Sequence, residues 1–191
     1  MTRIAILVGS TRPGRYGEAV AQWVYDQAAF RDDATFEIVD IAEHHLPLLD
    51  EPAAAAMSSD YTQPHTRRWS DTIASFDGYV FVTPEYNHSV SGALKNAIDY
   101  LYVEWQNKVA GFVGYGLHGG IRAVEHLRLV MAELQVADVR DQVALSLFTD
   151  FENMRVLRPA SHNVEILDRL LDQVVAWSQA LAPLRAKADL M

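Results

Sequence analysis

The sequence predicts an α/β fold in which helices cover both faces of a parallel, doubly wound five-stranded sheet. Two observations support this prediction. Five short apolar stretches alternate along the chain with longer stretches whose apolar residues recur at helical spacing. The first of these stretches, residues 4–8, is continuously apolar, which is typical of a strand buried on both faces. The chain has 191 residues and no internal repeat, so we expect one domain spanning residues 1–191.

The first third of the chain predicts two strands, one helix and a long loop. Residues 4–8 are continuously apolar and predict the first strand. Apolar residues recur at helical spacing over residues 18–30, and residues 35–40 predict the second strand. Three prolines and an alanine run make residues 44–64 irregular, so we expect a surface loop there.

The remaining pattern repeats the alternation of helix and strand. Helices are expected over residues 67–76, 92–102, 121–134 and 161 to about 181, and strands over residues 79–82, 109–113 and 143–147. Because proline lacks the backbone N–H that a helix needs, Pro183 is expected to follow the end of the last helix. The tail beyond it, with Arg185 and Lys187, is expected to be a frayed end.

Composition excludes several classes of function. The net charge of −9 argues against binding to a phosphate backbone, so no nucleic-acid partner is expected. The absence of cysteine excludes disulfides, thiolate nucleophiles and iron–sulfur clusters, so redox chemistry would require a bound cofactor. His44 and His45 have no third ligand at metal spacing, and no metal site is expected. The apolar run 4–8 is too short for a signal peptide or a membrane span, which favours a cytoplasmic protein without a membrane partner.

Ligands of such sheets bind at the carboxyl ends of the strands, where three loops of this sequence carry unusual residues. The first loop, residues 9–17, combines two hydroxyls and two cations just before a helix. Helix N-termini bind phosphate, and arginine forms forked hydrogen bonds with it. A phosphate site is therefore predicted, formed by Ser10, Thr11, Arg12, Arg15, Tyr16 and Gly17. The alternative is a solvated turn with two incidental arginines.

The second loop, residues 84–91, follows the third predicted strand. Pro84, Glu85, Tyr86 and Asn87 offer a fixed backbone, an aromatic face and amide groups that could meet the edge of a planar heterocycle. Ser89 or Ser91 is the expected N-cap of the next helix. The alternative for Tyr86 is simple packing on a neighbouring helix.

The third loop, residues 114–120, matches G-x-G-x-x-G, but it follows the fourth predicted strand. The dinucleotide fingerprint belongs in the first strand–helix turn, so we discount that interpretation. Gly116 and Gly119 are expected to let the backbone approach a flat ligand, close to a helix N-terminus that favours a reduced, anionic ring. His118 either contacts this ligand or faces solvent. No residue is predicted to be a catalytic acid or base.

These segments together resemble the NADPH-dependent FMN reductase family, flavodoxin-like proteins that include quinone and azo reductases. The resemblance runs from residue 4 to about residue 147. Its most specific part is Pro-Glu-Tyr-Asn at residues 84–87 followed by Leu-Lys-Asn-Ala-Ile-Asp at residues 94–99. Both common doubly wound strand orders fit the pattern of elements, and the resemblance implies the flavodoxin-like order 2-1-3-4-5.

The resemblance also implies a cofactor and its contacts. FMN would place its phosphate on the first loop and its isoalloxazine ring against the second, with Gly116 and Gly119 near the polar edge of the ring. Gly17 stands where many relatives carry a second hydroxyl donor. Family members are commonly dimers or tetramers, so a homodimer or homotetramer is expected. The aromatic segment 100–105 is then either interface or intramolecular core.

The activity implied is hydride transfer from NADPH or NADH through bound FMN to a small-molecule acceptor such as a quinone, an azo compound or free flavin. The cofactor supplies the chemistry, and the protein positions it. Two alternatives remain open from the sequence. One is a flavodoxin-type electron carrier that works with protein partners, which its acidic charge would suit. The other is a nucleotide-binding or regulatory module without flavin.

Overall fold

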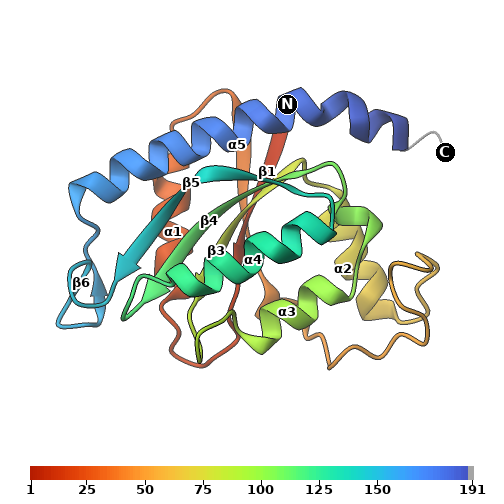
Figure 1. Ribbon diagram of the computed structural model, residues 1–191, viewed down its shortest axis with the longest axis horizontal. Coiled ribbons are helices and arrows are strands. Elements are labelled where there is room, and N and C mark those ends of the chain that lie inside the picture. The colour runs from red at the N-terminus through yellow and green to blue at the C-terminus, as the bar shows by residue number, and fades with distance from the viewer. Residues whose placement is uncertain (189–191) are drawn as a thin grey trace.

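The computed structural model describes residues 1–188 and contains the expected five-stranded parallel sheet (Figure 1). Its strand order is β2-β1-β3-β4-β5, which confirms the order implied by the family resemblance. The strands are β1 (Thr2–Val8), β2 (Ala34–Asp40), β3 (Gly78–Pro84), β4 (Val109–Gly116) and β5 (Ala137–Ser146). β5 begins six residues before the predicted strand, because its amino half is only partly buried and does not read as a continuous apolar run.

Helices cover both faces of the sheet. One face carries α1 (Gly17–Ala28) and α5 (Ser161–Ala188), and the other carries α2 (Pro64–Ala74), α3 (Gly92–Asp99) and α4 (Ile121–Glu133) (Figure 1). Two short 3₁₀ helices, η1 (Ile41–His44) and η2 (Val103–Trp105), follow β2 and α3. Successive side chains of β1 enter opposite cores: Ile4 and Ile6 face α1 and α5, whereas Ala5 and Leu7 face the other helices. This double burial explains the unbroken apolar run of that strand.

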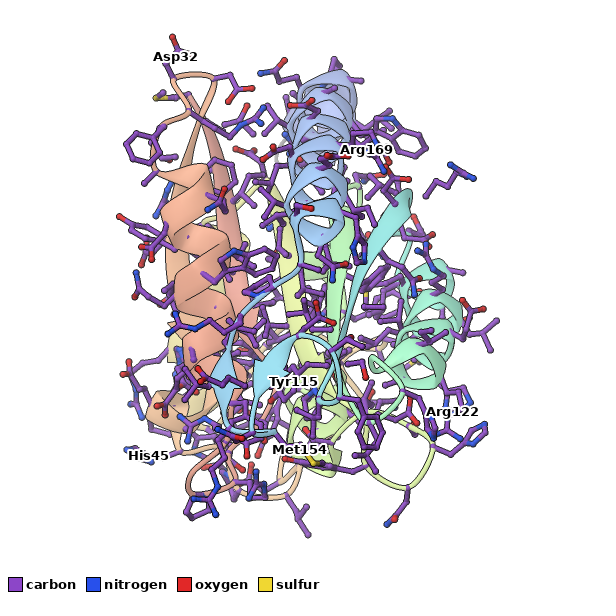
Figure 2. The ribbon with its side chains drawn as sticks, turned by 90° about the vertical axis from the view of Figure 1, so that its left-hand side faces the viewer. Asp32, His45, Tyr115, Arg122, Met154 and Arg169 are labelled. Carbon is purple, nitrogen blue, oxygen red and sulfur yellow. The ribbon has the colours of Figure 1, made fainter. Side chains whose placement is uncertain are left out.

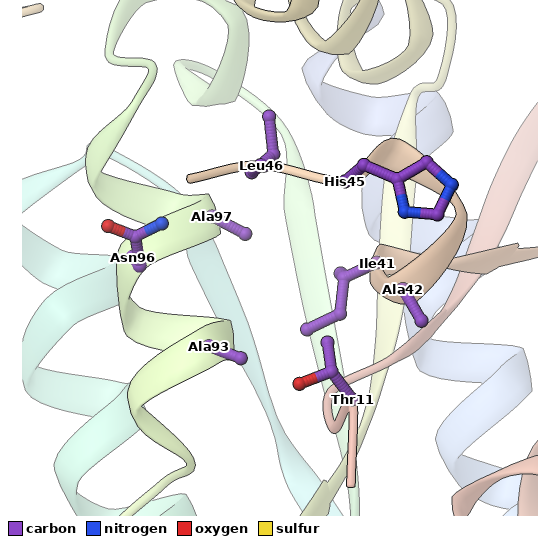
Figure 3. Close-up of a pocket in the computed structure, with 8 residues that line it drawn as sticks. All are labelled: Thr11, Ile41, Ala42, His45, Leu46, Ala93, Asn96 and Ala97. Carbon is purple, nitrogen blue, oxygen red and sulfur yellow. The ribbon is translucent and has the colours of Figure 1, made fainter. Parts of the chain in front are cut away.

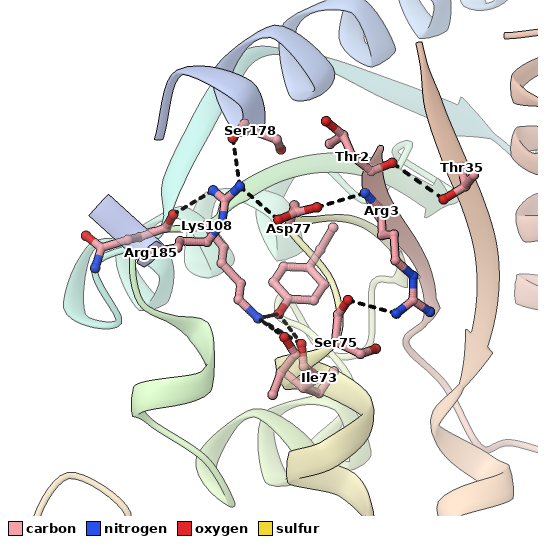
Figure 4. A network of polar contacts seen from close by, with 12 residues as sticks. Thr2, Arg3, Thr35, Ile73, Ser75, Asp77, Lys108, Ser178 and Arg185 are labelled. Atoms are coloured by element: carbon pink, nitrogen blue, oxygen red, sulfur yellow. Dashed lines mark hydrogen bonds and ion pairs between the residues drawn. The ribbon is translucent and has the colours of Figure 1, made fainter. Parts of the chain in front are cut away.

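The last helix contradicts the prediction that it ends before Pro183. α5 continues to Ala188 with the proline inside it. The hydrogen bond that Pro183 cannot make would go to Gln179, and both residues are exposed, so water can bind the freed carbonyl. The residues beyond the proline are also anchored: the Arg185 guanidinium donates to the Asn107 and Ser178 carbonyls and to Asp77 Oδ1, at 2.8–3.2 Å (Figure 4). The prediction of a frayed tail is therefore wrong for Arg185.

Arg185 belongs to a polar network at the amino ends of the strands (Figure 4). Asp77 accepts from Arg185 and, through its second oxygen, from the Arg3 N–H at 2.9 Å. Lys108 is only 6% exposed and donates to the Ile73 carbonyl, the Ala74 carbonyl and the Tyr79 hydroxyl. The cation thereby satisfies carbonyl groups at the carboxyl end of α2. The network ties α2, α5, β1, β3 and β4 together at this edge.

The aromatic segment after α3 is intramolecular core. α3 ends at Asp99, three residues earlier than predicted, and Tyr100, Leu101 and Trp105 are then almost fully buried. The Trp105 ring lies 5.0 Å from the Tyr79 ring of β3 in an edge-on arrangement. Of the two alternatives that the sequence left open for this segment, burial therefore supports packing within the protomer for these three side chains.

The irregular stretch between η1 and α2 is held in place by side chains. Glu51 accepts hydrogen bonds from Thr62 and Gln63, and the Tyr61 hydroxyl donates to Glu104 at 3.0 Å. Tyr61 is 7% exposed, so this loop contributes to the core. α2 begins at Pro64, three residues earlier than predicted, with the proline in the first turn where no N–H is required.

One element has no counterpart in the prediction. A two-stranded antiparallel hairpin, β6 (Phe151–Glu152) and β7 (Val156–Leu157), lies between β5 and α5. Two-residue strands are too short to show a hydrophobic period, which is why the sequence does not indicate them. Within residues 1–188, no helix combines the length and the apolar character that crossing a membrane would require.

Candidate functional site

The first two predicted loops are joined at the carboxyl edge of the sheet because β1 and β3 are neighbours. The Tyr86 hydroxyl lies 3.0 Å from Ser10 Oγ and accepts from Arg12 Nε at 3.2 Å. Ser10 is 1% exposed, whereas Arg12 is exposed. The structure thus brings together one hydroxyl and one cation from the first loop with the aromatic residue of the second. Tyr86 reaches the phosphate loop and is not buried against a helix.

The second loop is a tight, preorganised turn. Tyr86 and Ser89 exchange two backbone hydrogen bonds of 2.9 and 3.1 Å, and the two residues between them, Asn87 and His88, have φ values of 50° and 75°. These are the conformations of a primed hairpin turn, which asparagine tolerates well. Ser91 caps α3: its hydroxyl accepts from Leu94 N at 3.0 Å. This confirms Ser91, of the two serines considered, as the N-cap.

Glu85 connects the second loop to the start of α4. Its carboxylate accepts hydrogen bonds from the backbone N–H of Arg122 at 3.1 Å and from Arg122 Nε at 2.5 Å; Arg122 is labelled in Figure 2. The Glu85 side chain is only 7% exposed. Burial alone would raise the pKa of the Glu85 carboxyl, but the hydrogen bonds and charge of Arg122 outweigh burial and lower it. Glu85 is therefore ionised at neutral pH and holds the second and third loops at a fixed separation.

The glycines of the third loop serve packing more than ligand approach. Gly119 and Gly120 have φ near +69° and +68°, and a Cβ at Gly119 would lie 2.9 Å from the Ala144 Cβ. Gly119 is buried against β5. Gly116 differs, because a Cβ there would find its nearest atom at 3.8 Å. His118 is exposed, the outcome that the sequence left open as facing solvent.

A slot with a volume of about 150 Å³ opens between these loops. Its lining consists of Arg12, Tyr16, Pro84, Glu85, Tyr86, Tyr115, Gly116, Leu117 and Leu147. The lining combines the Arg12 cation and the Glu85 carboxylate with three tyrosines and two leucines. Seven of the predicted contacts are not among the lining residues of this slot: Ser10, Thr11, Arg15, Gly17, Asn87, His118 and Gly119. Of these, Asn87 is exposed on its turn, and Thr11 lines another cavity of about 310 Å³ between η1 and α3 (Figure 3).

The start of α1 carries positive charge and unpaired donors. Arg15 is paired with Asp40 at 2.5 Å and with Glu18 at 2.7 Å, so its charge is not free as the sequence suggested. Burial alone would lower the pKa of Arg15, but the hydrogen bond and charge of Asp40 raise it. No side chain caps α1, because the Tyr16 hydroxyl instead donates to the Met154 carbonyl at 2.9 Å.

Two buried polar atoms at this helix start, Arg15 Nε and Tyr115 Oη, have no hydrogen-bond partner within residues 1–188. Both can donate, and both lie beside the uncapped N–H groups of α1. A dianionic phosphate would satisfy these donors together. The slot next to them is lined by an aromatic residue, a proline and a glycine, which suits a flat ring. The residues present therefore fit FMN.

Comparison with known proteins decides the family. Residues 2–150 match the model of a family described as NADPH-dependent FMN reductase. The chain belongs to this family. An NAD(P)H-dependent FMN reductase from Nectria sp is 42% identical over 159 residues, covering 78% of this chain and 79% of the relative. A second one, from Schizosaccharomyces pombe, is 36% identical over 178 residues, covering 93% and 89%.

Solved structures agree on the fold. The flavoenzyme NAD(P)H:(acceptor) oxidoreductase FerB from Paracoccus denitrificans superposes with a TM-score of 0.73 at 20% identity, over 94% of this chain and 98% of that one. This FMN reductase is thus an oxidoreductase with a flavodoxin-like fold that uses FMN and NAD(P)H, as the motifs implied. The sequence analysis did not single out Tyr115, Leu117 and Leu147, which line the slot. It also missed Arg122 and Met154, which bond to Glu85 and Tyr16 from distant parts of the chain.

Proposed function

We propose that this FMN reductase passes electrons from NADPH or NADH to a small planar acceptor, with a quinone as the favoured class. The supporting observation is the convergence of three loops on one slot whose lining includes Arg12 and two leucines, together with unpartnered donors at the start of α1. Three relatives carry matching names. They are a 2-hydroxy-1,4-benzoquinone reductase from Burkholderia sp, a quinone reductase from Pseudomonas putida and an FMN-dependent NADPH-azoreductase from Staphylococcus saprophyticus, at 35%, 35% and 32% identity.

The polar end of the slot would hold the cofactor phosphate. Ser10 Oγ, Arg12 and the first N–H groups of α1 are the proposed donors, and Arg15 Nε adds one from behind. In this structure the Tyr86 hydroxyl is hydrogen-bonded to Ser10 Oγ and Arg12 Nε. A phosphate with three oxygens would take over these two donors and leave Tyr86 as a wall of the slot.

The ring would lie against Pro84, Tyr86 and Gly116. FMN, when bound, accepts a hydride from the nicotinamide and delivers the electrons to the second substrate. The protein would position the FMN and set the electrostatic potential around its ring. The Glu85–Arg122 pair fixes the spacing of the two loops. The Glu85 carboxylate accepts from the Arg122 N–H in the first turn of α4, so this helix end already carries a compensating negative charge.

The apolar side of the slot supports the choice of acceptor. Leu117 is 49% exposed although it lines the slot, and Leu147 stands next to it on the loop after β5. Large apolar side chains at a concave opening favour an apolar, planar ligand over a strongly hydrated ion. We further propose that the protein works in the cytoplasm, where NAD(P)H is abundant, as a homodimer or homotetramer.

The test is a steady-state assay of purified protein with NADPH, FMN and benzoquinone, without any reductase partner. We expect NADPH oxidation far above the rate with free FMN alone. A rate equal to that of free FMN would overturn the proposal and favour an electron carrier. Arg12→Ala should raise the Kd for FMN by roughly 10- to 100-fold, because a hydrogen bond to a charged group contributes about 1.5–3 kcal/mol. Arg140→Ala is the matched control, since Arg140 is 94% exposed on β5.

A further inference from the structure

The hydroxyl of Tyr115 is a buried donor without a partner. Tyr115 ends β4 and is 4% exposed, yet its Oη has no hydrogen bond within residues 1–188. Burial strongly disfavours the phenolate and raises the pKa of Tyr115, so the group is a neutral hydroxyl that can donate. Leaving such a group unsatisfied destabilises the folded protein. A phenylalanine would fill the same space without this cost, so the hydroxyl needs an explanation.

The Tyr115 side chain reaches the first residue of α1. A Cβ placed on Gly17 would lie 2.9 Å from Tyr115 Oη and 3.2 Å from Val8 Cγ1. Any larger residue at position 17 would therefore collide with the hydroxyl. Gly17 does not have a positive φ, so its backbone conformation does not require glycine. The space it leaves is what brings the Tyr115 hydroxyl to the helix N-terminus.

This helix end lacks the acceptors that would satisfy it. α1 has no side-chain cap, and its first backbone N–H groups have no acceptor within the helix. The Gly17 N–H is close enough to Oη to lower the Tyr115 pKa slightly, but the two do not form a hydrogen bond. The charges of Arg12 and Arg15 both act to lower the Tyr115 pKa, and Arg15 Nε is a second unpartnered donor. Asp40 and Glu18 pair with Arg15 Nη2, but the uncapped N–H groups of α1, Tyr115 Oη and Arg15 Nε are donors without an acceptor, and an anion with several oxygens would satisfy them.

We propose that Tyr115 Oη donates a hydrogen bond to the phosphate of FMN, and that Gly17 is present to admit it. The inference rests on the proposed function. It adds a residue of β4 to the phosphate contacts made by the loop that follows β1. It also explains why the loop needs no hydroxyl on Gly17, because Tyr115 of β4 supplies the donor at that position. Tyr115 lines the same slot as Arg12 and Tyr16, which places the phosphate and the ring in one continuous space.

The test compares FMN with riboflavin, which lacks the phosphate. Tyr115→Phe should raise the Kd for FMN roughly 10- to 100-fold in a fluorescence titration in phosphate-free buffer without nicotinamide nucleotide, because a charge-assisted bond is lost. The Kd for riboflavin should stay within about twofold. The melting temperature of the apoprotein should not fall, because the removed hydroxyl makes no bond there. Tyr25→Phe, in the carboxyl-terminal half of α1, is the control and should change none of these values.

A second variant pair tests the role of Gly17. Gly17→Ser alone should weaken FMN binding, because its Cβ meets the hydroxyl at 2.9 Å. In Gly17→Ser/Tyr115→Phe the nearest ring atom recedes to 3.7 Å, and a hydroxyl returns to the loop, so FMN should bind more tightly than to either single variant. An unchanged FMN Kd in Tyr115→Phe, or an equal loss for riboflavin, would refute the assignment. Wild-type protein that does not bind FMN would instead refute the proposed function.

Discussion

Glu85 offers a quantitative test of how the site is held together. Glu85→Gln keeps the shape of the side chain but removes the charge that accepts from the Arg122 N–H and guanidinium. Breaking a buried ion pair costs about 3–5 kcal/mol. Arg122 is 43% exposed, so water can solvate the released guanidinium. We therefore expect a loss of about 2 kcal/mol in the free energy of unfolding at neutral pH.

For a chain of this size, a loss of about 2 kcal/mol lowers the melting temperature by roughly 4–8 °C. Urea unfolding of the apoprotein followed by tryptophan fluorescence measures the difference directly. Asp99→Asn is the matched control, because its pair with Lys95 is 42–46% exposed, and it should cost less than about 1 kcal/mol. Equal losses of unfolding free energy in the two variants would refute the view that burial makes the Glu85–Arg122 pair more stabilising than an exposed pair.

The pH dependence of the same variant has a definite sign. The pKa of Glu85 is lower in the folded protein than its ordinary value of about 4.3. Its stabilising contribution is therefore complete above about pH 5 and is lost as the pH falls through the lower, folded-state pKa. The stability difference between wild type and Glu85→Gln should be constant from pH 8 to pH 5 and shrink below about pH 4. A difference that grows on acidification would contradict this reasoning.

Three further changes probe the supports of the site. Ser91→Ala removes the N-cap of α3 and its bond to the Gly9 carbonyl, so it should cost about 1–2 kcal/mol in urea unfolding. Gly120→Ala should lower the free energy of unfolding by more than about 2 kcal/mol, since the φ of Gly120 is +68° and a Cβ there would lie 2.7 Å from Tyr115 N. Gly14 has the same φ but open space around it, so the control Gly14→Ala should cost about 1 kcal/mol. Asp150→Ala leaves four donors without their acceptor and should lower stability by about 3 kcal/mol, measured by thermal unfolding.

The sequence predicts the sheet well because its central strands, β1, β3 and β4, are buried on both faces along most of their length. Residues such as Ile6 and Leu7 serve two different cores, and this leaves an unbroken apolar run that little else produces. The three site loops could be found for a similar reason. They follow strand ends, and strand ends of a parallel sheet share one edge. Local chemistry narrowed the N-cap of α3 to Ser89 or Ser91, and the structure shows that it is Ser91.

Long-range pairs explain what the sequence could not predict. Arg15 seemed to be a free phosphate ligand, but Asp40, 25 residues away, neutralises much of its charge. Glu85 meets Arg122 across 37 residues, and no local pattern indicates this contact. The end of α5 is a further case. The rule that proline ends a helix depends on local geometry alone, whereas Arg185 reaches Asp77, 108 residues away in the sequence.

The anchoring of Asp77 by Arg3 and Arg185 has a consequence for how this protein can change. These bonds, with those of Lys108, clamp the rim of the sheet that faces away from the slot. Leu117 is 49% exposed, whereas Leu147 packs against the core beneath α1 and α5. Leu117 is therefore the lining position whose shape can change at the least cost to the core, and under the proposed function such changes would alter which acceptors the slot admits.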